Sequence, residues 1–224
     1  MKIYTIGHSN YSMERFLDML RHYNINTVVD IRGTPYSKYN VQYDKEKLQE
    51  TLRSEGFIYI YMAKEFAAKR GNKQSYNGEG YSNFEEVVKE KDFLSGIERL
   101  KVGCSKGYRI ALLGAMQSPI RCHRCILLGR ELIKAGFELR HILDDYSLAT
   151  QEDMEKELLD KYFPNRNQLT IDELLGESMT EEEMINEGYR LANREIGYRV
   201  EGIGKKWCND RNNIIRYRWR YANA

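Results

Sequence analysis

The sequence predicts an α/β protein with a Rossmann-like, mostly parallel sheet flanked by helices, followed by a helical C-terminal extension. Short apolar or β-branched runs alternate with segments of helical periodicity, which is the pattern of parallel βαβ units. Several of these runs end in polar residues, as strands do where their carboxyl ends form a ligand site. We therefore expect an α/β core over residues 1–145 and a charged helical extension over residues 146–224.

Hydrophobic patterning predicts the first two strands and the helix between them. Residues 2–7 form a short apolar run that is typical of a buried strand. Ser12 is a suitable N-cap for a helix in which Phe16 and Leu20 recur at helical spacing. Residues 27–31 are rich in β-branched side chains and predict the second strand.

Residues 44–61 continue the alternation of helices and strands, and residues 63–91 interrupt it. A helix is expected over residues 44–55, where Gly56 would end it, and residues 57–61 predict the third strand. Residues 63–91 are polar and rich in glycine, so they do not resemble core. A loop of this length is usually a lid, a binding loop or disordered, and we expect one of these here.

The alternation resumes in the second half of the chain and then gives way to charged helices. A helix over residues 93–101 and a strand over residues 109–115 come first. A helix over residues 122–135, capped by Gly136, leads to a fifth strand that we expect to complete the sheet, at residues 137–142. The extension has the composition and spacing of two further helices, at residues 151–162 and 180–194.

The tail over residues 214–221 interleaves three arginines with three aromatic residues. Arginine can contact phosphate and an aromatic ring can stack on a base, which is one way of holding single-stranded nucleic acid. The alternation fits equally well a strand with two different faces, or an arm packed on the sheet.

Composition and charge exclude several classes of protein. The net charge is only +2, so the global positive field of many non-specific DNA-binding proteins is absent. The four cysteines do not have the spacing of a disulfide framework, and this favours reduced thiols in the cytoplasm. The N-terminal residues do not form a signal peptide, and no apolar run is long enough to span a membrane. The histidines and cysteines show no spaced pair of pairs, so we expect no zinc site, and the sequence identifies no cofactor.

A reactive segment lies between the fourth strand and the next helix, and the chain is organised around it. Here Cys122 stands between Arg121 and Arg124 at the expected start of a helix. Helix N-termini and neighbouring cations stabilise anions and thiolates, so this position favours a low thiol pKa or a bound phosphate. The segment indicates a site without defining its reaction.

Polar residues from three separate segments are expected to meet at one edge of the sheet. In a parallel sheet the strand carboxyl ends share an edge, where ligands bind. The residues nearest the chemistry are predicted to be His8, Asp30 and Cys122. The residues predicted to bind substrate are Ser9, Asn10, Arg32, Ser37, Arg121, His123 and Arg124.

Three motifs give the chain a resemblance to a known family. They are Thr5-Ile6-Gly7-His8-Ser9-Asn10, Val29-Asp30-Ile31-Arg32 and Pro119-Ile120-Arg121-Cys122-His123-Arg124, and the later Ile196-Gly197-Tyr198-Arg199 is also similar. The chain resembles the bacterial and archaeal family catalogued as domain of unknown function 488. The resemblance implies a compact α/β domain and no settled biochemical function. The chain departs from the family pattern at Gly114-Ala115-Met116 and at Phe66-Ala67-Ala68.

Three functional hypotheses follow from these residues. The first is an enzyme acting on a nucleotide or nucleic acid, with arginines holding phosphate and Asp30 or His8 acting as base. Within it, Asp30 and Arg32 could instead form a structural ion pair that braces two loops. The second is a thiol redox enzyme that uses Cys122 and Cys125, which form a Cys-x-x-Cys motif. Within it, Cys122 could instead be a small buried residue that packs without reacting. The third is a binding module without catalysis, in which the strand-end residues bind a nucleotide or nucleic acid and the C-terminal extension contacts a partner.

Overall fold

A computed structural model describes residues 1–166 and 179–200, and its centre is a six-stranded sheet. The strand order is β3-β2-β4-β1-β5-β6, and every neighbouring pair is parallel except β5 and β6. The strands are β1 Lys2–Gly7, β2 Thr27–Asp30, β3 Ile58–Tyr61, β4 Ile110–Gly114, β5 Glu138–Ile142 and β6 Leu148–Ala149. The predicted α/β class and its mostly parallel sheet are therefore confirmed.

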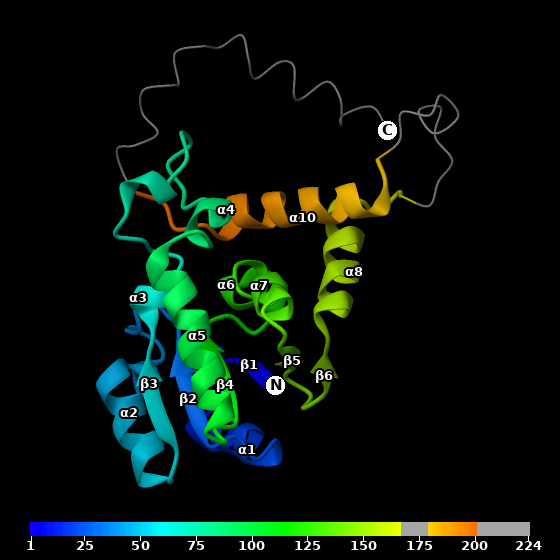
Figure 1. The fold of residues 1–224 in the computed structure, drawn as a ribbon. Coiled ribbons are helices and arrows are strands. Elements are labelled where there is room, and N and C mark those ends of the chain that lie inside the picture. The colour runs from blue at the N-terminus through cyan, green and yellow to red at the C-terminus, as the bar shows by residue number, and fades with distance from the viewer. Residues whose placement is uncertain (167–178, 201–224) are drawn as a thin grey trace.

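Helices cover both faces of this sheet, as Figure 1 shows. The longer helices are α1 Met13–His22, α2 Lys45–Ser54, α5 Lys91–Ser105, α7 Gly129–Lys134, α8 Gln151–Tyr162 and α10 Glu181–Ile196. Consecutive strand residues belong to opposite halves of the core: Val28 packs with α1 and α2, whereas Val29 packs with α5. Strands buried on both faces must be apolar throughout, which explains why their runs could be recognised in the sequence.

Local signals set several of the element ends that were predicted. The Ser12 side chain accepts a hydrogen bond from the Arg15 backbone N–H and caps α1. Gly56 ends α2 with a φ of 82°, a conformation that favours glycine. Thr150 and Thr180 form capping boxes at the starts of α8 and α10. These signals depend on neighbours in sequence, which is why they could be predicted.

The structure corrects two predictions around the fourth and fifth strands. The helix expected over residues 122–135 is broken into the short helix α6, His123–Ile126, and α7, which begins at Gly129. The backbone N–H groups of Leu127 and Leu128 both donate to the His123 carbonyl, and the Gln151 side chain fills the space beside Gly129. The sheet also continues beyond the fifth strand, because β6 adds an antiparallel edge.

Residues 63–91, predicted as a lid, a binding loop or a disordered segment, contain short helices and buried residues. The helices are α3 Ala63–Phe66, a 3-10 turn at Lys73–Ser75 and α4 Phe84–Val87. Phe66 and Phe84 belong to the hydrophobic core. The Arg70 side chain is almost wholly buried and pairs with Glu90, and this ion pair ties the two ends of the segment together. Much of this segment is therefore packed structure.

The described part of the C-terminal extension packs on the α/β core. Leu158 of α8 and Ala192 of α10 belong to the same hydrophobic cluster as the strand residues Val29 and Leu112. Asn193 of α10 donates to the Ser82 carbonyl, and its side-chain oxygen accepts from the Phe84 backbone N–H. No helix within residues 1–166 and 179–200 is long and apolar enough to cross a membrane. The basic aromatic tail predicted at residues 214–221 lies outside the described residues.

Candidate functional site

The carboxyl ends of β1, β2 and β4 form one edge of the sheet and open onto a cavity of about 800 Å³. These three strands are neighbours, since β4 lies between β1 and β2. The predicted convergence of strand-terminal residues is therefore present in the structure. The predicted site residues that line the cavity are His8, Ser9, Asn10, Arg32, Ser37, Arg121, Cys122 and His123. Asp30 and Arg124 are not among the residues that line it.

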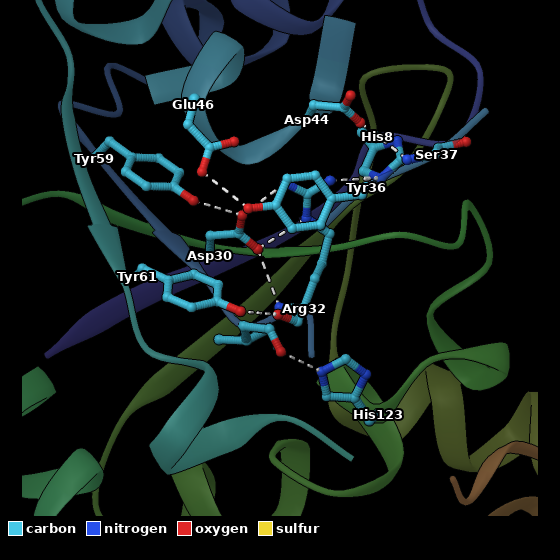
Figure 2. A network of polar contacts seen from close by, with 11 residues as sticks. His8, Asp30, Arg32, Tyr36, Ser37, Asp44, Glu46, Tyr59, Tyr61 and His123 are labelled. Carbon is cyan, nitrogen blue, oxygen red and sulfur yellow. Dashed lines mark hydrogen bonds and ion pairs between the residues drawn. The ribbon is translucent and has the colours of Figure 1, made fainter. Parts of the chain in front are cut away.

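Asp30 is wholly buried and does not line the cavity. It forms an ion pair with Arg32, which Figure 2 shows. One carboxylate oxygen of Asp30 accepts from the Arg32 backbone N–H at 3.0 Å and from its Nε at 2.9 Å. The other accepts from Arg32 Nη2 at 2.6 Å and from the Tyr59 hydroxyl at 2.8 Å. Both oxygens are thus occupied, and the carboxylate is wholly buried. The predicted role of Asp30 as a base does not fit this geometry, which matches the alternative of a structural ion pair.

His8 connects this ion pair to the cavity. Its Nδ1 lies 2.8 Å from the Ser9 carbonyl oxygen and its Nε2 lies 3.2 Å from Arg32 Nη1. The guanidinium can only donate, so Nε2 accepts and Nδ1 carries the proton. Burial and the charge of Arg32 lower the pKa of His8 to about 4. The Tyr43 ring stacks on the imidazole with centroids 4.3 Å apart. His8 is therefore held as a neutral imidazole at the cavity wall.

Cys122 and His123 form a pair of reactive groups beside this network. Cys122 Sγ lies 3.8 Å from His123 Nδ1, and His123 Nε2 donates to the Ile31 carbonyl at 3.0 Å. Burial alone would raise the pKa of Cys122, but the charges of Arg124 and His123 outweigh it and lower this pKa to about 5. Burial lowers the pKa of His123, but the charge and hydrogen bond of the Cys122 sulfur raise it. Together with the Ile31 hydrogen bond they outweigh burial, so the pKa of His123 is raised overall. Both shifts favour a thiolate at Cys122 beside a protonated His123.

Arg124 supports the thiolate from inside the fold. Its side chain is wholly buried, with Nη1 donating to the Met116 carbonyl and Nη2 to the Gln117 carbonyl at 2.6 Å. Among the described residues no carboxylate forms an ion pair with it. A buried cation requires a compensating anion, and the Cys122 thiolate supplies one. The phosphate contact predicted for Arg124 does not fit this position, because the side chain is wholly buried and does not line the cavity.

Two glycines make room for this arrangement. A Cβ at Gly114, the last residue of β4, would lie 2.6 Å from Cys122 Sγ. A Cβ at Gly7, the last residue of β1, would overlap the Met116 carbonyl and lie 2.8 Å from Arg124 Nη1. Only glycine leaves space for the thiol and the guanidinium to approach the ends of these strands. Gly114 also stands where the chain departs from the resembled family pattern.

The remaining predicted substrate-binding residues differ in how accessible they are. Asn10 and Arg121 are exposed, while Ser9 and Ser37 are half-buried. The Ser37 hydroxyl accepts from the backbone N–H groups of Tyr39 and Asn40, both at 3.2 Å. Ser37 therefore orders its own loop, and Arg121 is the more accessible group for an anionic ligand.

Sequence reasoning missed several residues of the cavity wall. Lys69 comes from the segment after α3, and Glu195 and Tyr198 come from the end of α10 and the residues after it. Glu195 pairs with Lys161 at 2.6 Å, and Lys69 Nζ lies 5.3 Å from the centre of the Tyr198 ring. The motif Ile196-Gly197-Tyr198-Arg199 was noted for its resemblance, and it was the one signal that could have placed this segment at the site.

Cys125 faces away from the cavity into the core. Its side chain is wholly buried, and Gln151 Nε2 donates to its sulfur at 3.4 Å. Burial raises the pKa of Cys125 to about 12, so this thiol is protonated. Within the described ranges, no group of three or more His, Cys, Asp or Glu side chains is arranged to hold a metal ion.

Two buried histidines are expected to make the protein less stable in mild acid. Burial lowers the pKa of His141 to about 4, as it does for His8. A histidine whose pKa is lowered on folding stabilises the protein above its unfolded pKa, and this contribution is lost as the pH falls towards 4. Each histidine should lower the free energy of unfolding by about 2 kcal/mol between pH 6.5 and pH 5. Cys122, whose pKa is also lowered on folding, should lower it as well over this range. Urea unfolding across this range measures the loss.

The control for this experiment is His22→Gln, because His22 is exposed on α1. This variant should show the same pH dependence as the wild type. Equal free energies of unfolding at pH 7 and pH 5 would show that the two buried histidines titrate normally and would contradict the expectation.

Comparison with known proteins gives one match. The sequence model of a family described as Domain of unknown function DUF488 matches residues 12–130. This range contains the Asp30–Arg32 ion pair, the Cys122–His123 pair and Arg124. No curated protein and no solved structure matches the chain.

Proposed function

From the premise that the chain belongs to the family of domain of unknown function DUF488, we propose that it is an enzyme whose nucleophile is the Cys122 thiolate. Its substrate is a nucleotide or a nucleic acid. The observation that carries this proposal is the Cys122–His123 pair, which lines a cavity large enough for a small molecule. A thiolate with an oriented histidine beside it is the arrangement that cysteine nucleophiles share.

The roles of the two residues follow from their contacts. The Cys122 sulfur attacks an electrophilic centre of the substrate, and its electron pair forms the new bond. The leaving group departs with the proton that His123 holds at Nδ1, the nitrogen that faces the sulfur. The Ile31 carbonyl accepts from His123 Nε2 and keeps the ring in this orientation, as a third group does in catalytic triads. Water then attacks the same centre and gives its proton to His123, and the bond to the sulfur breaks, so that the thiolate and the protonated His123 are restored.

The charges around the cavity support an anionic substrate. Arg121 and Lys69 are exposed at the cavity, and neither forms an ion pair with the described residues. Arg32 adds a third cation, although Asp30 neutralises most of its charge. Glu195 is the acidic side chain of the wall and is itself paired with Lys161. A phosphate group would therefore find uncompensated positive charge here.

The test is the rate at which iodoacetamide alkylates Cys122 as a function of pH, followed by peptide mass spectrometry. The rate should rise with a midpoint near pH 5, because alkylation requires the thiolate and the pKa of Cys122 is lowered to about 5. Cys104 is an internal control, since burial raises its pKa. His123→Gln should move the midpoint of Cys122 to higher pH. A wild-type midpoint near pH 9 would reject the nucleophile.

Protection from alkylation then tests the substrate class. Nucleotides or oligonucleotides that fill the cavity should slow the alkylation of Cys122 and leave that of Cys104 unchanged. If only protection is seen and no turnover is found for any nucleotide or nucleic acid, the site is a binding module. If neither is seen, the nucleotide substrate is rejected while the reactive thiol remains.

A thiol redox enzyme is the second candidate, and the lowered pKa of Cys122 supports it, although Cys125 faces the core and does not line the cavity. Dithiol redox sites pair a reactive cysteine with a second cysteine three residues on, as Cys122 and Cys125 are arranged. Cys122 has a lowered pKa and Cys125 a raised one. A redox enzyme would lose activity in Cys125→Ala, whereas an enzyme that uses only the Cys122 thiolate would keep it.

A further inference from the structure

Exposed aromatic side chains line the cavity or lie on the loop that forms part of its wall. Tyr39 is 92% exposed and Tyr36 is 55% exposed, on the loop that follows β2, and Tyr198 is 37% exposed. Tyr36 and Tyr198 line the cavity, and Met116, 51% exposed, lies on the loop that follows β4 and lines it too. Single exposed apolar residues are normal on a protein surface, but a group of them around one opening indicates a binding surface.

The loop that carries two of these tyrosines is already ordered. The Tyr36 hydroxyl donates to Glu46 of α2 at 2.9 Å, a contact drawn in Figure 2. The Ser37 hydroxyl accepts from the backbone of Tyr39, and Asp44 accepts from the Ser37 N–H at 2.9 Å. The rings are therefore presented to solvent by a fixed backbone, which lowers the entropy cost of binding.

Cationic side chains accompany the tyrosines. Lys38 lies between Tyr36 and Tyr39 in the sequence, and Lys69 and Arg121 line the cavity. All three are exposed, and among residues 1–166 and 179–200 none of them has an ion-pair partner. Aromatic faces interleaved with unpaired cations are the two components of surfaces that bind single strands: rings stack on bases and cations contact phosphates.

Building on the function proposed above, we propose that the substrate is a single-stranded nucleic acid. One nucleotide enters the cavity beside Cys122, and the flanking bases stack on Tyr36 and Tyr39. The phosphates of the strand lie along the three cations of the rim, Lys38, Lys69 and Arg121.

The geometry favours a strand over two other ligands. A free nucleotide would use the cavity but would leave Tyr39, which is almost fully exposed and does not line it, without a role. A duplex keeps its bases stacked inside, so it offers no free base face to the tyrosines, and a nucleotide could enter the cavity only at the cost of unstacking and unpairing it. A single strand uses the cavity, the aromatic rings and the cations together.

The test is the fluorescence anisotropy of labelled single-stranded DNA and RNA, measured with full-length Cys122→Ser so that no turnover occurs. Tyr39→Ala should weaken binding by about tenfold, since stacking on one ring contributes about 1–3 kcal/mol. Val102→Ala, an exposed residue near the end of α5, is the matched control and should bind as the parent does. Each of Lys38→Ala, Lys69→Ala and Arg121→Ala should reduce the slope of log affinity against log salt by about 0.7. Lys106→Ala is their control, at the far end of α5.

Each alternative outcome rejects the proposal. Equal affinity of Tyr39→Ala and Val102→Ala would show that the ring does not stack on bases. Preference for a duplex, or competition by a mononucleotide as strong as that by an oligonucleotide, would assign a different ligand. If no nucleic acid binds, but an acidic peptide with few arginines or lysines does, the surface formed by the tyrosines and cations around the cavity binds proteins.

The pH profile of alkylation separates this proposal from the function on which it rests. Tyr39→Ala should keep the midpoint of Cys122 near pH 5, because Tyr39 is not among the groups that shift this pKa. If the midpoint of Cys122 alkylation lies near pH 5 but no single strand binds, the proposed single-stranded substrate is rejected and the proposed Cys122 nucleophile is retained. If the midpoint of Cys122 alkylation lies near pH 9 but single strands bind, the proposed Cys122 nucleophile is rejected and the proposed binding surface is retained.

Discussion

Asp30→Asn is expected to lower the free energy of unfolding by about 3–5 kcal/mol, because it leaves the buried Arg32 guanidinium without its counter-charge. Asp30 is wholly buried and Arg32 is 6% exposed, so water cannot replace the lost carboxylate. The amide would also turn a donor towards either the guanidinium or the Tyr59 hydroxyl, which are themselves donors to Asp30. Thermal and urea unfolding measure the loss, which corresponds to a fall in melting temperature of about 10 °C.

A second ion pair of the same chain provides the control. Lys64 and Asp92 are 3.0 Å apart, with side chains that are 77% and 47% exposed. Asp92→Asn should cost less than about 1 kcal/mol, because solvent screens an exposed pair. If Asp30→Asn unfolds with the stability of the wild type, Asp30 is not a structural residue, and a direct role in chemistry would have to be considered again.

Arg124→Met is expected to return the Cys122 thiol to its protonated form at neutral pH. Arg124 is the largest of the influences that lower the pKa of Cys122, and burial opposes it. Without this charge the pKa should rise from about 5 to the range of an ordinary cysteine or above, so the thiolate fraction at pH 7 falls to a few per cent or less. The midpoint of the alkylation profile measures this shift.

Arg121→Met is the matched control for this experiment. Arg121 is exposed three residues earlier in the sequence and is not among the principal groups that shift the pKa of Cys122. Its removal should leave the midpoint near pH 5 and affect only the binding of anionic ligands. If Arg124→Met folds and keeps the midpoint near pH 5, the buried guanidinium does not stabilise the thiolate.

The central strands β1, β2 and β4 could be predicted from the sequence because they are buried on both faces. Val28 and Val29 both face core, on opposite sides, so the run is continuously apolar and stands out from its surroundings. The break between α6 and α7 could not be predicted, since it lies where the Gln151 side chain packs against Gly129. That contact joins residues that are distant in sequence, and helical periodicity does not report it.

The sequence could predict which site residues follow the strand ends. It could not predict which of the site residues are buried. His8, Arg32 and Cys122 follow three strands, and the parallel sheet brings them together at one edge. Whether Asp30 and Arg124 face the cavity or the interior depends on tertiary packing. Two arginines of one motif, Arg121 and Arg124, consequently have opposite environments, one exposed and one wholly buried.

The cavity is completed by residues that come much later in the chain than its thiol. Cys122, Arg124 and the strand ends that hold them precede α8, whereas Glu195 and Tyr198 of the wall follow most of α10. During synthesis from the N-terminus, the groups that lower the thiol pKa leave the ribosome before this part of the wall does. Synthesis therefore delivers Cys122 and Arg124 before the residues that complete the wall of the cavity.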